Sequence, residues 1–131
     1  MKNNPKISLT HIKKDFSFLK QELKNDRILG VILYGSYAKN EQHARSDIDI
    51  CIIAPKCKTP KEIAGLLGFI WQNINANIYD IRIFEELPLY IKISIINNHR
   101  IIYAKDKYSL YEYFYLYRKL WQDQSLHWIE K

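Results

Sequence analysis

The sequence predicts an α/β fold in which a small β-sheet is flanked by helices. Three apolar runs typical of strands, at residues 28–34, 47–54 and 77–84, alternate with segments whose apolar residues recur at helical spacing. The chain has 131 residues, of which 47% are hydrophobic and 26% charged. These proportions are typical of a globular protein, and we expect one domain over residues 1–131.

The first half of the chain predicts two helices and two strands. Residues 8–25 carry apolar side chains at helical spacing, and Ser8 or Thr10 can cap this helix. The recurring side chains are Ile12, Phe16, Leu19 and Leu23. The strand at residues 28–34 leads into the Gly35-Ser36 turn, and residues 37–42 could form a short helix before the strand at 47–54.

The second half predicts a helix over residues 60–74, the strand at 77–84 and a short edge strand at 100–103. The segment 87–96 is ambiguous, because its isoleucines favour a strand whereas Pro88 suits the first turn of a helix. A helix over about residues 106–125 completes the chain.

The motif with the most chemical information is Gly35-Ser36 followed ten residues later by Asp47-Ile48-Asp49. Side chains alternate along a strand, so the two aspartates lie on one face. A divalent cation would offset their repulsion, and magnesium prefers such oxygen ligands. A Gly-Ser turn lets backbone N–H groups approach a phosphate. Either motif alone is more often an ordinary turn or strand end, but together they indicate a site for a metal-bound nucleoside triphosphate.

Charge and cysteines exclude several classes of function. The formal net charge of +6 is compatible with a polyanionic ligand and equally with a solvated basic surface. The chain has no long run of basic residues, so a nucleic-acid groove is not indicated. Cys51 lies in an apolar run and is expected to be a buried free thiol, and no Cys-His cluster indicates zinc. No apolar stretch reaches membrane-spanning length, so we expect a soluble, cytoplasmic protein.

The stretch GSYAKNEQHARSDIDI resembles the nucleotidyltransferases of the DNA polymerase beta superfamily, and most of all their minimal (MNT) group, which is often encoded beside HEPN-domain toxins. The resemblance covers roughly residues 28–104. It implies a mixed sheet and favours a helix opened by Pro88. The sequence departs from the common Arg-Gly of the family at Lys39-Asn40: the lysine keeps the charge without the bidentate fork, and asparagine tolerates a left-handed conformation.

The resemblance also implies a third carboxylate on a neighbouring strand, and Asp80 is the matching position. Ile81 and Ile83 would face the core, whereas Asp80 and Arg82 would share the opposite face. The alternatives are that Asp80 is an ordinary exposed aspartate, or that Glu85 or Glu86 is the third acid. Both glutamates fall where the strand should be ending.

Nucleotidyl transfer by two magnesium ions would then use each motif. Asp47 and Asp49 would hold both ions, and Asp80 would complete the one nearest the acceptor and could accept its proton. Ser36 and the N–H groups after Gly35 would hold the β- and γ-phosphates. Lys39 or Arg45 could balance the charge of pyrophosphate, although a solvated surface explains these two cations equally well.

The activity implied is a magnesium-dependent adenylyltransferase, specifically an antitoxin that moves AMP from ATP to a tyrosine of its HEPN toxin. One alternative is the same chemistry on a small hydroxylated molecule such as an aminoglycoside or lincosamide. Another is a module that neutralises a toxin by binding alone. The intact set of acids argues against the last.

The C-terminal segment carries more apolar surface than one helix face needs. Its tyrosines are Tyr108, Tyr111, Tyr113, Tyr115 and Tyr117. On a helix, these residues and their apolar neighbours form three stripes, whereas one stripe is enough to pack on a small domain. The segment is either a surface for the toxin or for a second copy of the chain, or a helix buried on several sides.

Overall fold

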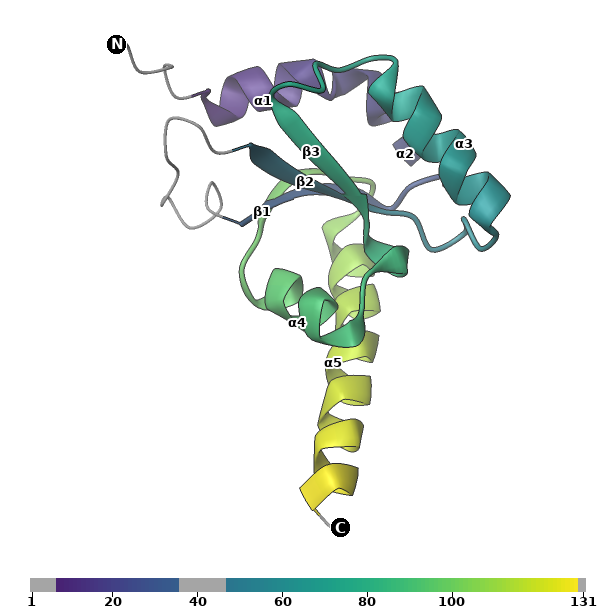
Figure 1. The fold of residues 1–131 in the computed structure, drawn as a ribbon, viewed down its shortest axis with the longest axis vertical. Coiled ribbons are helices and arrows are strands. Elements are labelled where there is room, and N and C mark those ends of the chain that lie inside the picture. The colour runs from purple at the N-terminus through teal and green to yellow at the C-terminus, as the bar shows by residue number, and fades with distance from the viewer. Residues whose placement is uncertain (1–6, 36–46, 130–131) are drawn as a thin grey trace.

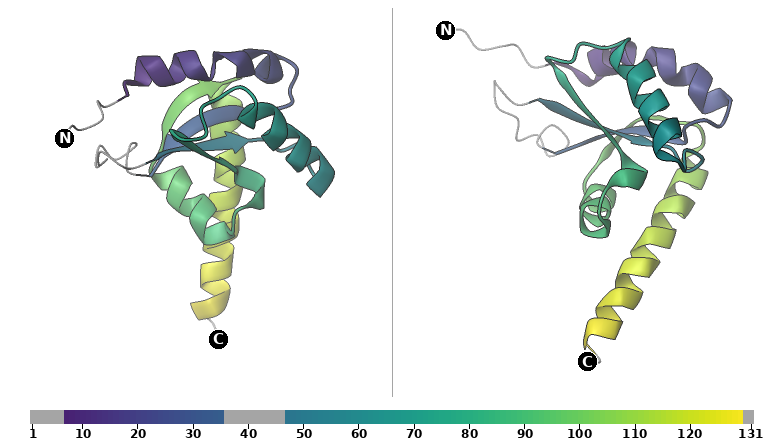
Figure 2. Two further views of the ribbon diagram at one scale, coloured as in Figure 1. Left: turned by 45° about the horizontal axis from the view of Figure 1, so that its top comes forward. Right: turned by 45° about the vertical axis from the view of Figure 1, so that its right-hand side comes forward.

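The computed structural model describes residues 7–35 and 47–129, with side chains as far as residue 124. The described elements in chain order are α1 (Leu9–Asp15), η1 (Ser17–Leu19), α2 (Lys20–Lys24), β1 (Gly30–Tyr34), β2 (Ile48–Ile53), α3 (Pro60–Trp71), β3 (Tyr79–Ile83), η2 (Phe84–Glu86), α4 (Leu89–Asn97), β4 (Arg100–Ala104) and α5 (Lys107–Ile129). α1, α2 and α3 cover one face of the sheet, and α4 and α5 lie on the other (Figures 1 and 2). No helix in the described ranges is both long and apolar enough to cross a membrane.

The sheet is mixed, as expected. Its described strands have the order β3-β2-β1-β4. β1 pairs antiparallel with both β2 and β4, whereas β2 and β3 run parallel. β4 lies at the edge, as predicted for residues 100–103, and its pairing with β1 is interrupted by a register shift between Val31 and Ile32.

The prediction of one continuous helix over residues 8–25 is wrong, although its apolar residues were identified correctly. Ser8 caps α1 by accepting a hydrogen bond from the backbone N–H of His11 at 3.1 Å. The hydroxyl of Ser17 donates to the carbonyl oxygen of Lys14 at 2.8 Å, and this bond competes with helix continuation. A 3-10 turn therefore separates α1 from α2. The four residues of the predicted stripe, Ile12, Phe16, Leu19 and Leu23, are all buried.

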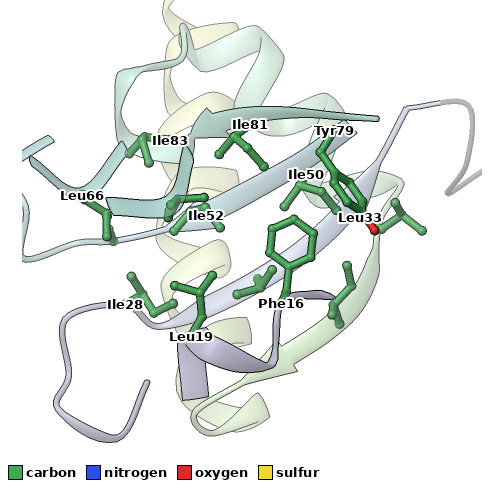
Figure 3. Packing of buried hydrophobic residues seen from close by; sticks show 14 of the residues in the cluster. Phe16, Leu19, Ile28, Leu33, Ile50, Ile52, Leu66, Tyr79, Ile81 and Ile83 are labelled. Atoms are coloured by element: carbon green, nitrogen blue, oxygen red, sulfur yellow. The ribbon is translucent and has the colours of Figure 1, made fainter. Parts of the chain in front are cut away.

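One hydrophobic cluster lies between the sheet and the helices α1, α2 and α3 (Figure 3). β2 contributes Ile48, Ile50 and Ile52 to it, and β3 contributes Tyr79, Ile81 and Ile83. The ring of Phe16 lies edge-on to that of Tyr79, with centroids 4.8 Å apart. The Tyr79 hydroxyl donates to Asp15 Oδ2 at 2.5 Å, so this buried tyrosine also fixes the end of α1.

A second cluster fills the opposite face of the sheet. Cys51 and Ile53 point into it from β2, and it also contains residues of α4 and α5. Because β2 is buried on both faces, its sequence is almost continuously apolar rather than alternating. Cys51 is a buried free thiol, as predicted.

Local signals explain the remaining boundaries. Thr59 and Glu62 form a reciprocal capping box around Pro60, which starts α3. This helix ends at Trp71, three residues before the predicted end. The ambiguous segment is helical, with Pro88 as the N-cap of α4. α5 begins close to the expected residue and continues to Ile129, four residues further than predicted.

Candidate active site at the ends of β1, β2 and β3

The candidate site is built on three neighbouring strand ends. Tyr34 of β1 lies opposite Asp49 of β2, and Asp49 lies opposite Asp80 of β3. Residues directly opposite each other on paired strands share a face of the sheet. The three side chains therefore form a row on the face that also carries Cys51. We call the two carboxylates of this row, Asp49 and Asp80, the acid row. The predicted orientation of Asp49 and Asp80, away from the core that holds Ile50 and Ile81, is confirmed.

Gly35 brings the chain close to this row. Its φ is +73°, a conformation that L-residues rarely adopt. A Cβ atom added at Gly35 would collide with Oδ2 of Asp49 and would lie 3.2 Å from its Cγ. Glycine is therefore required twice here, by the backbone angle and by the carboxylate beside it.

Like charges are concentrated at this end of the sheet. Burial raises the pKa of the Asp49 carboxyl above its usual value, and the charges of Asp80 and Asp47 raise this pKa further. Arg82 opposes the shift, and its Nε lies 3.5 Å from Oδ2 of Asp80. Both of these side chains are well exposed, so the pair offsets little of the repulsion. The site thus holds an excess of negative charge that a cation would relieve.

Asp47 lies just before β2 and is exposed. It is two residues before Asp49, the spacing at which side chains of an extended chain point to the same side. In the described parts of the chain, no group of three or more His, Cys, Asp or Glu side chains is arranged so that it could hold a metal ion. The donor chemistry fits magnesium, because the aligned groups are carboxylates at the exposed edge of a rigid sheet. The structure therefore brings two of the three predicted acids side by side, whereas a closed three-carboxylate site stays a prediction.

The other predicted residues of the site lie outside the described residues. Ser36, Lys39 and Arg45 all belong to residues 36–46, as does the short helix expected at 37–42. Their roles in phosphate binding also stay predictions.

Glu85, the alternative third acid, is used elsewhere. Its Oε1 accepts a hydrogen bond from the backbone N–H of Ala54 at 2.9 Å, and its Oε2 accepts one from the Tyr113 hydroxyl at 2.7 Å. Burial raises the pKa of this carboxyl, although the two hydrogen bonds lower it. Glu85 follows β3 at the far end from Asp80 and joins β2 to α5, so it is a structural residue rather than part of the acid row.

Sequence reasoning missed Tyr34. This tyrosine is half-buried beside Asp49, and burial, followed by the charges of Cys51 and Asp49, raises the pKa of its hydroxyl. Its position directly before Gly35 at the end of an apolar run was the available signal. Its cross-strand partner, however, depends on the register between β1 and β2, and this register cannot be read from the sequence.

The acid row is distant from a cavity of ≈ 560 Å³ at the other end of the sheet. The cavity is lined by Lys20, Gln21, Leu23, Lys24, Tyr103, Ala104 and Lys105. Ala104 lies opposite Gly30 at the start of β1, whereas Asp49 lies opposite Tyr34 at its end. The described acids of the candidate site therefore do not line this cavity.

A mixed four-stranded sheet in the described residues, with aligned carboxylates beside a positive-φ glycine, defines an α/β domain of the nucleotidyltransferase type. The sequence model of the family described as "Polymerase beta, Nucleotidyltransferase" matches residues 17–108. The chain belongs to this family and is a nucleotidyltransferase.

Known proteins agree with this assignment. The chain is 53% identical, over 99 residues, to a Methanocaldococcus jannaschii protein named "Putative protein adenylyltransferase"; the match covers 76% of this chain and 74% of that protein. In solved structures, the fold is similar to a chain of the complex of the tri-AMPylated Shewanella oneidensis HEPN toxin with MNT antitoxin, at TM-score 0.62 and 11% identity over 92% of both chains. It is also similar to a chain of a MntA-HepT toxin-antitoxin structure, at TM-score 0.54 and 12% identity over 88% of this chain and 91% of that one.

Proposed function

We propose that this protein is a magnesium-dependent adenylyltransferase that transfers AMP from ATP to a tyrosine hydroxyl of a partner HEPN toxin, and so acts as an antitoxin. The observation that carries the proposal is the row formed by Asp49 and Asp80 beside Gly35. Family membership supports the reaction type, and the 53% identical relative supports a protein as the acceptor. The likeness in fold to chains of two toxin-antitoxin complexes motivates the choice of toxin.

The acids would provide the ligands that the reaction needs. Asp47, Asp49 and Asp80 would hold two magnesium ions, which neutralise charge on the transferring phosphoryl group when bound. Asp80 lies on the strand at the edge of the row, where an incoming acceptor can reach it. It would take the proton of the acceptor hydroxyl as the oxygen bonds to the α-phosphorus of ATP. The bond from that phosphorus to the bridging oxygen breaks, and pyrophosphate leaves.

The turn after β1 would hold the leaving phosphates. Gly35 would let the backbone approach them closely, because it has no side chain, whereas a Cβ atom there would collide with Asp49. The hydroxyl of Ser36 and the N–H groups after Gly35 would donate to the β- and γ-phosphates. Lys39 or Arg45 would balance the charge of pyrophosphate.

The test is nucleotidyl transfer in vitro with purified chain, ATP labelled in the α-phosphate and magnesium chloride. The acceptor is a HEPN-domain protein sought among the products of the neighbouring genes. We expect label on a toxin tyrosine, located by peptide mass spectrometry. Chelation of magnesium by EDTA, or the substitution Asp49→Asn, should remove it. Asp123→Asn, on the exposed part of α5, is the matched control and should leave transfer unchanged.

Two outcomes would contradict the proposal. Label on an aminoglycoside or lincosamide but not on the toxin would assign the chemistry to a small acceptor. Inhibition of the toxin without any transfer, equally well by the wild type and by Asp49→Asn, would make the chain a binding module.

A further inference from the structure

The surface of α5 exposes far more apolar area than the rest of the described chain. Seven large hydrophobic side chains are exposed in the described residues, and all but Tyr90 belong to α5. The six are Tyr108, Tyr111, Tyr115, Leu116, Leu120 and Trp121, with exposures from 78% at Tyr108 to 38% at Trp121. Exposed patches of this size on a small protein mark sites of interaction.

The inner side of α5 already has its contacts. Leu110 and Phe114 are buried in the second cluster, and Tyr113 and Tyr117 pack on Phe84 with ring centroids 6.0 and 5.3 Å away. These four residues recur at helical spacing and define the side that faces the body. In the two views of Figure 2, α5 passes α4 and extends away from the sheet, so its opposite side is free of the described chain.

We define the outer face of α5 as Tyr108, Tyr111, Glu112, Tyr115, Leu116 and Lys119. All six side chains are exposed. Glu112 and Lys119 are seven residues apart, about 10 Å along the axis, so they are too distant to pair within one helix. Neither forms an ion pair with another described residue.

This face is complementary to itself when two copies of the helix run antiparallel. If a twofold axis passes between Tyr115 and Leu116, each of these residues lies opposite the other one in the second copy. Glu112 then lies opposite Lys119 of the second copy. The symmetry makes each contact twice, so both charges on each helix are paired and apolar side chains face apolar side chains.

The exposed apolar area of the outer face supplies part of such an interface. With roughly 150–250 Å² for a whole aromatic side chain, its four exposed hydrophobic residues, Tyr108, Tyr111, Tyr115 and Leu116, offer on the order of 400 Å². A stable interface buries about 800 Å² per partner, so the polar residues of the face and of the adjoining surface supply the other half. The tyrosines combine apolar area with a polar tip, as favoured at interfaces.

We propose that the outer face of α5 binds the same face of a second copy of this chain, antiparallel, about a twofold axis near Tyr115 and Leu116. The interface lies on the side of α5 opposite its contacts with the body. The proposal does not depend on the reaction that the site performs.

The test is the dissociation constant of the full chain, from sedimentation velocity and light scattering over a concentration series. The wild type should be a dimer. Glu112→Lys or Lys119→Glu alone places like charges at both symmetric contacts and should weaken the dimer roughly 10-fold. The double charge swap should restore it, which only a contact between the two copies explains. Tyr111→Ala with Tyr115→Ala should weaken it roughly 100-fold or more.

Lys61→Glu, on the exposed surface of α3, is the matched control and should leave the dimer unchanged, and far-UV circular dichroism verifies that each variant is folded. A monomeric wild type at about 100 μM would overturn the proposal, including the case in which this face binds the toxin instead. A dimer that is insensitive to the tyrosine substitutions would also overturn it. Single reversals that weaken the dimer without rescue by the double swap would rule out the antiparallel register.

Discussion

At the scale of single residues, Asp49 is a carboxylate in an unfavourable position. It is partly buried and lies opposite Asp80, and its pKa is raised above the ordinary value of 3.8. For a raised acid pKa, the associated stability is fully present below the unfolded pKa and is lost as the pH rises through the folded pKa. The folded protein therefore carries a free-energy penalty at neutral pH, which the cation proposed above would offset when bound.

We therefore expect Asp49→Asn to raise the free energy of unfolding at pH 7 by about 0.2–1 kcal/mol, the range for like charges directly opposite on paired strands. The gain should vanish at a pH below 3.8, where the wild-type carboxyl is protonated in both states. Urea unfolding at the two pH values measures this. A variant that is less stable at pH 7, or one whose gain persists in acid, would show that the repulsion is unimportant.

Gly35 allows a second prediction at this scale. Gly35→Ala should cost about 1–2 kcal/mol, because alanine disfavours the positive φ and its Cβ would displace the Asp49 carboxylate. Nucleotidyl transfer should fall as well. Gly65→Ala is the matched control: a Cβ there meets nothing within 4 Å on the exposed side of α3, so the change should stabilise the protein by about 0.5–1 kcal/mol. Equal effects of the two substitutions in urea unfolding would refute the special role of Gly35.

At the scale of elements, α5 is fixed to the sheet through Glu85. This carboxylate joins the end of β2 at Ala54 to the hydroxyl of Tyr113, while Lys92 of α4 lies 4.6 Å from the ring centre of Tyr117. A polar link through a half-buried carboxyl group depends on each of its partners, because a lost partner leaves a polar atom without a hydrogen bond.

Tyr113→Phe should accordingly destabilise the protein by about 1–2 kcal/mol, since it removes a hydrogen bond to the half-buried carboxyl of Glu85. Tyr115→Phe changes the same hydroxyl on the exposed side of α5 and should have little effect on the stability of the monomer. Thermal unfolding at low protein concentration compares the two. If both variants unfold at the wild-type temperature, the Glu85 link does not hold α5 in place.

At the scale of the whole molecule, both faces of the sheet are covered. Helices α1, α2 and α3 cover one face and α4 and α5 the other (Figure 1), and the candidate site lies at the end of the sheet where β2 and β3 begin. In the described residues, the candidate site is therefore a strand edge formed by β2 and β3.

Local patterns in the sequence were sufficient for the element types, the sheet strands and the acid pair. Apolar residues at every second position indicate the buried side of a strand, and apolar residues three or four positions apart indicate that of a helix. Residues such as Thr59 and Pro60 indicate where a helix starts. The break between α1 and α2 was missed because it depends on one hydroxyl, that of Ser17, which bonds to the backbone instead of to solvent.

The sequence by itself determined the α/β architecture and the family, because these depend on periodicity and on a motif of fixed spacing, and it named the candidate acids. Only the tertiary structure decided that Asp49 lies between Tyr34 and Asp80, that Glu85 holds α5 rather than joining the acids, and which side of α5 stays exposed. The physical reason is that strand register and helix packing arise from contacts between residues distant in the chain, and a local pattern carries no record of those contacts.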